Sequence, residues 1–97
     1  MKDSFLRFLG IAKGAGKILE GYNKCEDGMR NGKVSLIILS EDVSSNTLNK
    51  FLNYGNKYNI KVLIKYRKDE LGCAIGRREI KVIGITDENM SKKLSSL

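Results

Sequence analysis

The sequence predicts an α/β fold, a three-layer α/β/α sandwich with a mixed sheet of about four strands. Apolar residues recur with helical spacing in several segments, and short apolar runs rich in β-branched residues lie between these segments. The chain has 97 residues, of which 41% are hydrophobic and 30% are charged, which is typical of one small globular domain. We therefore expect residues 1–97 to form a single domain.

The first predicted elements are a helix and a short strand. The helix runs from about Ser4, its expected N-cap, to Gly14, and Gly16 contributes to its end. Ile18 and Leu19 then form a strand-like segment before Gly21.

A second helix and a central strand follow. Asn23 and Glu26 have the spacing of a capping box, which predicts that Asn23 caps a short helix. The dipeptide Asn31-Gly32 is a strong turn signal. The apolar run from Val34 to Leu39 predicts a central strand that is covered on both faces.

A third helix is expected after a polar loop at residues 41–47, and Asn59 should end it. Its buried side is expected to consist of Leu48, Phe51, Leu52, Gly55 and Tyr58. The alternation from Lys61 to Tyr66 predicts a partly exposed strand. Val62, Ile64 and Tyr66 should lie on one side of it, with Lys61, Lys65 and Arg67 near or beyond the other.

The C-terminal segment predicts a short helix, a strand and a last helix. The short helix runs from Lys68 to about Ala74 and leaves through a turn at Ile75-Gly76. Residues 79–86 form the last strand, with Ile80 and Val82 inside. Asp87 should cap a terminal helix, whose inner residues are Met90 and Leu94.

The charge of the chain favours a polyanionic partner. Eighteen Lys and Arg residues against eleven Asp and Glu residues give a net charge of +7 and a pI near 9.5. This excess makes nucleic acid the first partner to consider, and a basic surface that serves solubility is the alternative.

The sequence predicts neither a membrane segment nor a catalytic centre. Its longest clean apolar run, residues 36–39, is far shorter than the roughly 20 residues of a membrane span. No signal peptide pattern opens the chain, so we expect a cytoplasmic location. Cys25 and Cys73 are far apart and histidine is absent, which excludes a zinc knuckle and a Cys-His nucleophile. We expect both thiols to be reduced and packed, and the protein to be non-catalytic without cofactor or metal.

The candidate binding site is the start of the second predicted helix, at Gly21, Tyr22, Asn23 and Lys24. Backbone N–H groups at a helix N-terminus lack intrahelical partners and attract anions such as an RNA phosphate. Capping alone would also explain Asn23.

Basic residues are expected to surround this site. The segment from Lys13 to Lys17 lacks the first glycine and the final Ser or Thr of a Walker loop, so its glycines are interpreted as a helix terminator. Lys13 and Lys17 would instead extend a basic rim. Arg77 and Arg78 follow the turn at Gly76, where they would contact phosphate or stack on a base. A solvated charge run is the alternative for the two arginines.

Four motifs carry a family resemblance. They are Phe8–Ala12 with Ala15–Lys17, Gly21–Asn23, Ser40–Thr47, and Glu70–Gly72 with Ile75-Gly76. In order and spacing they resemble the family of ribosomal proteins that bind kink-turn RNA, and within it the bacterial YlxQ type. The similarity covers about residues 5 to 94.

The resemblance implies a three-layer α/β/α fold that binds structured RNA through the second helix and a hydrophobic loop near the last strand. The family's helix motif is Gly, small residue, Asn, Glu, two variable residues and Lys. This sequence supplies Gly21 and Asn23, but Lys24 takes the glutamate position and Asp27 the lysine position. Lys24 only donates hydrogen bonds where the glutamate accepts them from guanine, and Asp27 repels the phosphate that a lysine attracts.

The second family contact region corresponds to Gly76 to Ile80, which is more charged than the apolar loop of strong kink-turn binders. We therefore expect backbone contacts and recognition of RNA shape. The expected protein is a monomer that binds ribosomal or other structured RNA. The alternative, favoured by Lys24 and Asp27, is a protein-interaction module of ribosome assembly or transcription that has lost strong kink-turn binding.

Overall fold

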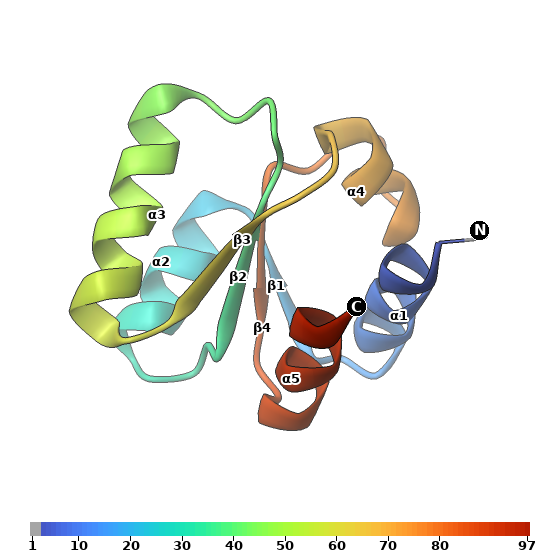
Figure 1. Ribbon diagram of the computed structural model, residues 1–97, viewed down its shortest axis with the longest axis horizontal. Coiled ribbons are helices and arrows are strands. Elements are labelled where there is room, and N and C mark those ends of the chain that lie inside the picture. The colour runs from blue at the N-terminus through green and yellow to red at the C-terminus, as the bar shows by residue number, and fades with distance from the viewer. Residues whose placement is uncertain (1–2) are drawn as a thin grey trace.

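The computed structural model describes residues 3–97, in which helices and strands alternate (Figure 1). The elements in chain order are α1 (Ser4–Gly14), β1 (Ile18–Glu20), α2 (Tyr22–Arg30), β2 (Leu36–Leu39), α3 (Ser45–Tyr58), β3 (Lys61–Ile64), α4 (Lys68–Ala74), β4 (Val82–Ile85) and α5 (Glu88–Ser96).

The four strands form one mixed sheet in the order β1-β4-β2-β3. β4 is antiparallel to both β1 and β2, whereas β3 runs parallel to β2. Both central strands are buried along their whole length, so β2 is the doubly covered strand that its apolar run predicts.

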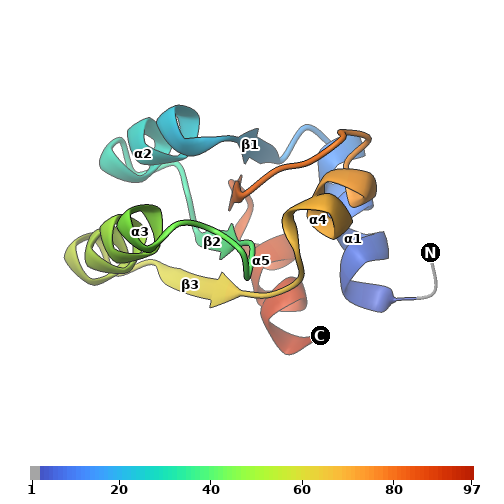
Figure 2. The same cartoon turned by 90° about the horizontal axis from the view of Figure 1, so that it is seen from above.

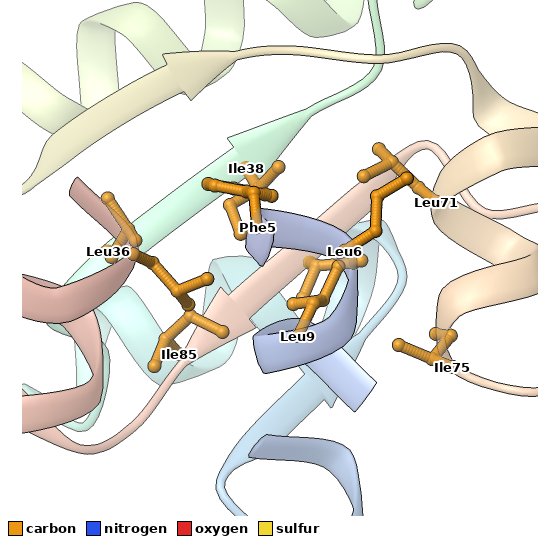
Figure 3. Close-up of a cluster of buried hydrophobic side chains, with 10 residues drawn as sticks. Phe5, Leu6, Leu9, Leu36, Ile38, Leu71, Ile75 and Ile85 are labelled. Carbon is orange, nitrogen blue, oxygen red and sulfur yellow. The ribbon is translucent and has the colours of Figure 1, made fainter. Parts of the chain in front are cut away.

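Helices cover both faces of the sheet, as Figure 1 and the view from above in Figure 2 show. Side chains of β2 alternate between the two faces because successive residues of a strand point in opposite directions. Leu36 and Ile38 pack with residues of α1, α4 and α5, including Phe5, Leu9 and Leu71 (Figure 3).

The opposite face is covered by α2 and α3. Ile37 and Leu39 pack there with Cys25, Met29 and Phe51. The α/β class and the three-layer arrangement are thus confirmed, including the mixed four-stranded sheet.

Three local predictions were wrong. Asp3, and not Ser4, caps α1, because its Oδ1 accepts a hydrogen bond from the Leu6 N–H at 3.1 Å. The strand predicted over residues 61–66 ends at Ile64, which is 47% exposed. Tyr66 lies beyond it with φ of 67°, where the chain has left the extended conformation.

The last strand and the thiols also differ from expectation. β4 begins at Val82, and residues 79–81 are a loop that leads into it. Cys25 is buried as expected, and its burial raises the pKa of the thiol to about 12, so this sulfur is unreactive. Cys73 is exposed, and the two cysteines are free.

Other boundaries agree with their predictions. Asn59 ends α3 in the left-handed conformation, with φ of 56°. Asp87 caps α5 and accepts a hydrogen bond from the Met90 N–H at 2.9 Å. Within residues 3–97 no helix is both long and apolar enough to cross a lipid bilayer.

Candidate functional site

The start of α2 opens onto a hollow of about 280 Å³, which we call the α2 hollow. In Figure 2, three segments come together at this end of the sheet: the first turn of α2, the loop from β2 to α3, and the loop from α4 to β4. The hollow is lined by Gly21, Tyr22, Val43, Ser44, Thr47, Glu79, Ile80, Lys81 and Val82.

Among the residues that the structure describes, no side chain caps the start of α2. Its N-cap is Gly21, whose φ of 95° and ψ of 167° lie in a region that is practically restricted to glycine. Gly21 donates its own N–H to the carbonyl of Val82 at 2.9 Å, which fixes the helix start against β4. The backbone N–H groups of the first turn of α2 have no intrahelical acceptor, so they are available to an external one.

Asn23 does not cap this helix, so the capping-box prediction was wrong. It lies inside the first turn, after Gly21 and Tyr22, with an exposed side chain. Among residues 3–97 its side-chain amide has no hydrogen-bond partner. Glu26, the second residue of the supposed box, accepts a hydrogen bond from the Tyr54 hydroxyl and lies near Arg30 at 3.7 Å.

Tyr22 offers the α2 hollow its backbone N–H group, because its ring is packed in the core. The ring packs edge-to-face on Phe51, with 5.1 Å between the ring centroids, and belongs to the α2/α3 side of the core. The side chain is half-buried, so it anchors the first turn of α2 beside the hollow.

The neighbouring helix α3 also begins at the hollow, but its N-terminus is closed. Ser44 caps it, because the Ser44 Oγ accepts a hydrogen bond from the Thr47 N–H at 3.2 Å. The uncapped start of α2 therefore distinguishes it from α3 as a site for an external anion.

Lys13, Glu20 and Arg77 form a cluster next to Gly21, which we call the Glu20 cluster. The Nε of Arg77 donates to Oε1 of Glu20 at 2.7 Å, and the Nζ of Lys13 donates to Oε2. The guanidinium of Arg77 and then the ammonium of Lys13 hold the pKa of Glu20 below its usual range. Sequence reasoning missed Glu20, since no local pattern shows that a residue 57 positions away reaches it.

The other predicted cations are not all near the hollow. Lys17 precedes β1, whereas Gly21 follows it, so about 13 Å of extended chain separates them. Lys24 lines a different hollow on α2, together with Asp27, and this second hollow has a volume of about 180 Å³. Arg78 is exposed and has no ion-pair partner among residues 3–97.

The loop that carries both arginines is held by the backbone. Gly76 adopts φ of 75°, and the Arg77 N–H donates to the Gly72 carbonyl at 2.8 Å, which ends α4. Further along, the Ile80 N–H donates to the Lys68 carbonyl at 3.0 Å. The predicted turn at Gly76 is thus confirmed and is left-handed, and it leads the chain toward β4.

A larger hollow of about 430 Å³ lies at the other end of the sheet. Its lining residues include Ser35, Lys61, Glu88 and Lys92, and none of the predicted site residues. Within residues 3–97 no three Cys, Asp or Glu side chains are grouped so that they could hold a metal ion.

A model of the ribosomal protein L7Ae/L30e/S12e/Gadd45 family matches residues 3–95. The chain belongs to this family. The RNA-binding protein YlxQ of Bacillus subtilis (strain 168) is 36% identical over 93 residues, which cover 92% of this chain and 89% of that protein. The RNA-binding protein YlxQ of Enterococcus faecium is 28% identical over 96 residues, which cover 99% of this chain and 92% of that protein. The predicted resemblance to the YlxQ type of this family is therefore confirmed.

Two solved structures are similar to this protein. A protein of unknown function from Bacillus halodurans C superposes with a TM-score of 0.94 at 36% identity, covering 96% of this chain and 94% of that one. The Giardia lamblia 15.5kD RNA binding protein superposes with a TM-score of 0.84 at 15% identity, covering 99% and 88%. At 15% identity, the similarity to the Giardia lamblia protein shows a shared fold only.

Proposed function

We propose that this protein binds structured RNA without catalysing a reaction, and that the α2 hollow is the centre of its interface. The observation that carries the proposal is the open N-terminus of α2, which has no side-chain cap. The helix dipole and the first-turn amides favour an anion there. An RNA phosphate fits this preference in a chain that is similar to two proteins named RNA-binding proteins.

Exposed cations around the hollow support a polyanionic ligand. Lys81 lines it, and Arg78 lies three residues earlier in the same loop. Asn23 adds a side-chain amide that can both donate and accept hydrogen bonds. The net charge of +7 would steer RNA toward the protein from a distance.

The proposed ligand is kinked or otherwise folded RNA, with ribosomal RNA as one candidate. The first turn of α2 and the loop from α4 to β4 face the same hollow from two directions, so they can contact two backbone segments of a bent RNA. Lys24 lines the second hollow with Asp27 and only donates hydrogen bonds. Recognition would therefore depend on backbone shape, and one copy of the chain supplies the whole interface.

The test is a binding titration of a kink-turn RNA and a matched duplex across a salt series. Asn23→Ala should weaken binding of the kinked RNA, because it removes an exposed amide at the mouth of α2. Arg78→Gln should weaken binding and lower the salt slope by about 0.7 to 0.9 if one phosphate contact is lost. Lys92→Gln removes the same charge at the other end of the sheet and serves as the matched control.

The proposal requires that wild type binds the kinked RNA at low salt and that the two site variants lose more affinity than Lys92→Gln. Absence of wild-type binding to either RNA would reject it. Equal effects of Arg78→Gln and Lys92→Gln would reject the location of the site.

A second candidate function is docking of a protein partner in ribosome assembly or transcription. Asp27, whose side chain is 70% exposed, places an acidic group on α2 where the family motif has a lysine. A pull-down from nuclease-treated extract separates the two functions. A partner that remains bound after digestion, and whose capture Asp27→Asn reduces, would favour protein docking.

A further inference from the structure

Two of the predicted site cations already hold an anion. Lys13 and Arg77 come from the end of α1 and from the loop after α4, and both contact the carboxylate of Glu20. Arg77 also places its Nη2 at 3.5 Å from the second oxygen of this carboxylate. Both oxygens of Glu20 are therefore occupied.

The cluster is arranged with its carboxylate inside and its cations outside. The side chain of Glu20 is 20% exposed, compared with 35% for Lys13 and 56% for Arg77. Two positive charges surround one negative charge, so the cluster keeps a net charge of +1 on its outer side. Glu20 directly precedes Gly21, so the cluster lies beside the start of α2 in the chain, although none of its three side chains lines the α2 hollow itself.

We infer that Lys13 and Arg77 form a phosphate seat that Glu20 occupies in the free protein, so that Glu20 limits the affinity for RNA. This inference rests on the proposed function of the α2 hollow. An RNA phosphate enters the seat only when the Arg77 guanidinium exchanges the carboxylate for a phosphate oxygen, for which its planar fork is equally suited.

The exchange needs only a side-chain movement. The backbone of Arg77 is fixed by the hydrogen bond from its N–H to the Gly72 carbonyl at 2.8 Å. Its side chain is more than half exposed, at 56%, so it can turn toward solvent without disturbing the core. Among residues 3–97 Arg78 pairs with no carboxylate, so of the two neighbouring arginines Arg77 is the one whose contribution depends on Glu20.

The experiment compares RNA binding by wild type, Glu20→Gln, Arg77→Gln and the double variant, over a salt series with the same kink-turn RNA. Glu20→Gln should raise affinity about three- to tenfold at low salt and steepen the salt slope by about 0.7 to 0.9, because the seat becomes free for one phosphate. The double variant should lose this gain. Glu88→Gln makes the same charge change beyond the far end of β4 and should leave the slope unchanged.

Each outcome separates the inference from the proposed function. If wild type binds the RNA and Glu20→Gln binds no better, or if the gain persists without Arg77, the seat is rejected and RNA binding stands. If Glu20→Gln binds more weakly with an unchanged salt slope, Glu20 only stabilises the loop from α4 to β4 and the inference is wrong. If none of the four proteins binds RNA, the proposed function and the inference both fail.

Discussion

Gly21 is the residue on which the geometry of the site most depends. Its φ of 95° and ψ of 167° belong to a conformation that other residues adopt only under strain, although a methyl group there would meet no atom within 4 Å. Gly21→Ala should therefore lower the free energy of unfolding by about 1–3 kcal/mol through the backbone alone. Urea denaturation measures this loss.

Gly14 provides the matched control for Gly21. It is the last residue of α1, has no positive φ, and likewise has open space at its Cβ position. Gly14→Ala should leave stability unchanged or raise it by up to about 1 kcal/mol. Equal stability of the two variants would show that Gly21 is not strained.

Glu20 gives the site a measurable pH dependence. Arg77 and Lys13 hold the pKa of Glu20 below its ordinary value of about 4.5, so the ion pairs contribute stability above that pH. This contribution is lost as the pH falls through the lowered pKa. In an NMR titration of the carboxyl carbon, Arg77→Gln should raise the pKa of Glu20 toward the ordinary value. An unchanged pKa in that variant would contradict the observed pairing.

At the scale of elements, Gly72 positions the loop that carries the arginines. A Cβ on Gly72 would lie 2.5 Å from the Cα of Glu79 and 2.7 Å from its backbone N. Neither backbone atom can move aside cheaply, so Gly72→Ala should destabilise the protein by about 1–3 kcal/mol and displace the loop. In Gly72→Ala, the midpoint temperature of thermal unfolding and the RNA affinity should both fall, whereas Gly14→Ala should lower neither. An intact RNA affinity would mean that the loop does not take part in binding.

Element types could be read from the sequence, but several ends could not. Periodicity identified α3 and the buried strand β2, because their patterns are long or strongly apolar. The cap of α1 was assigned one residue too late, since Asp3 and Ser4 are both good N-caps. At α2, the Asn23 and Glu26 spacing imitated a capping box, while a glycine with positive φ set the actual start.

At the scale of the whole molecule, tertiary contacts decided what local patterns could not. The sheet order places β4 between β1 and β2, so the end of β1 and the loop before β4 become neighbours. Sequence reasoning proposed Gly21 and Arg77 as parts of one site, and this topology brings their segments together. Sequence reasoning gave no basis for excluding Lys17 from that site. Lys17 and Gly21 are close in sequence, and the sequence does not show that the short strand β1 places them at its opposite ends.

The central claim is that the uncapped start of α2 contacts RNA, and backbone amide NMR tests it most directly. In a titration of the wild-type protein with kink-turn RNA, the N–H signals of Tyr22, Asn23 and Lys24 should shift most, together with those of residues 76–81. Signals of α5, at the other end of the sheet, should stay nearly constant. Shifts centred on α5, with unchanged amides at the start of α2, would contradict the account.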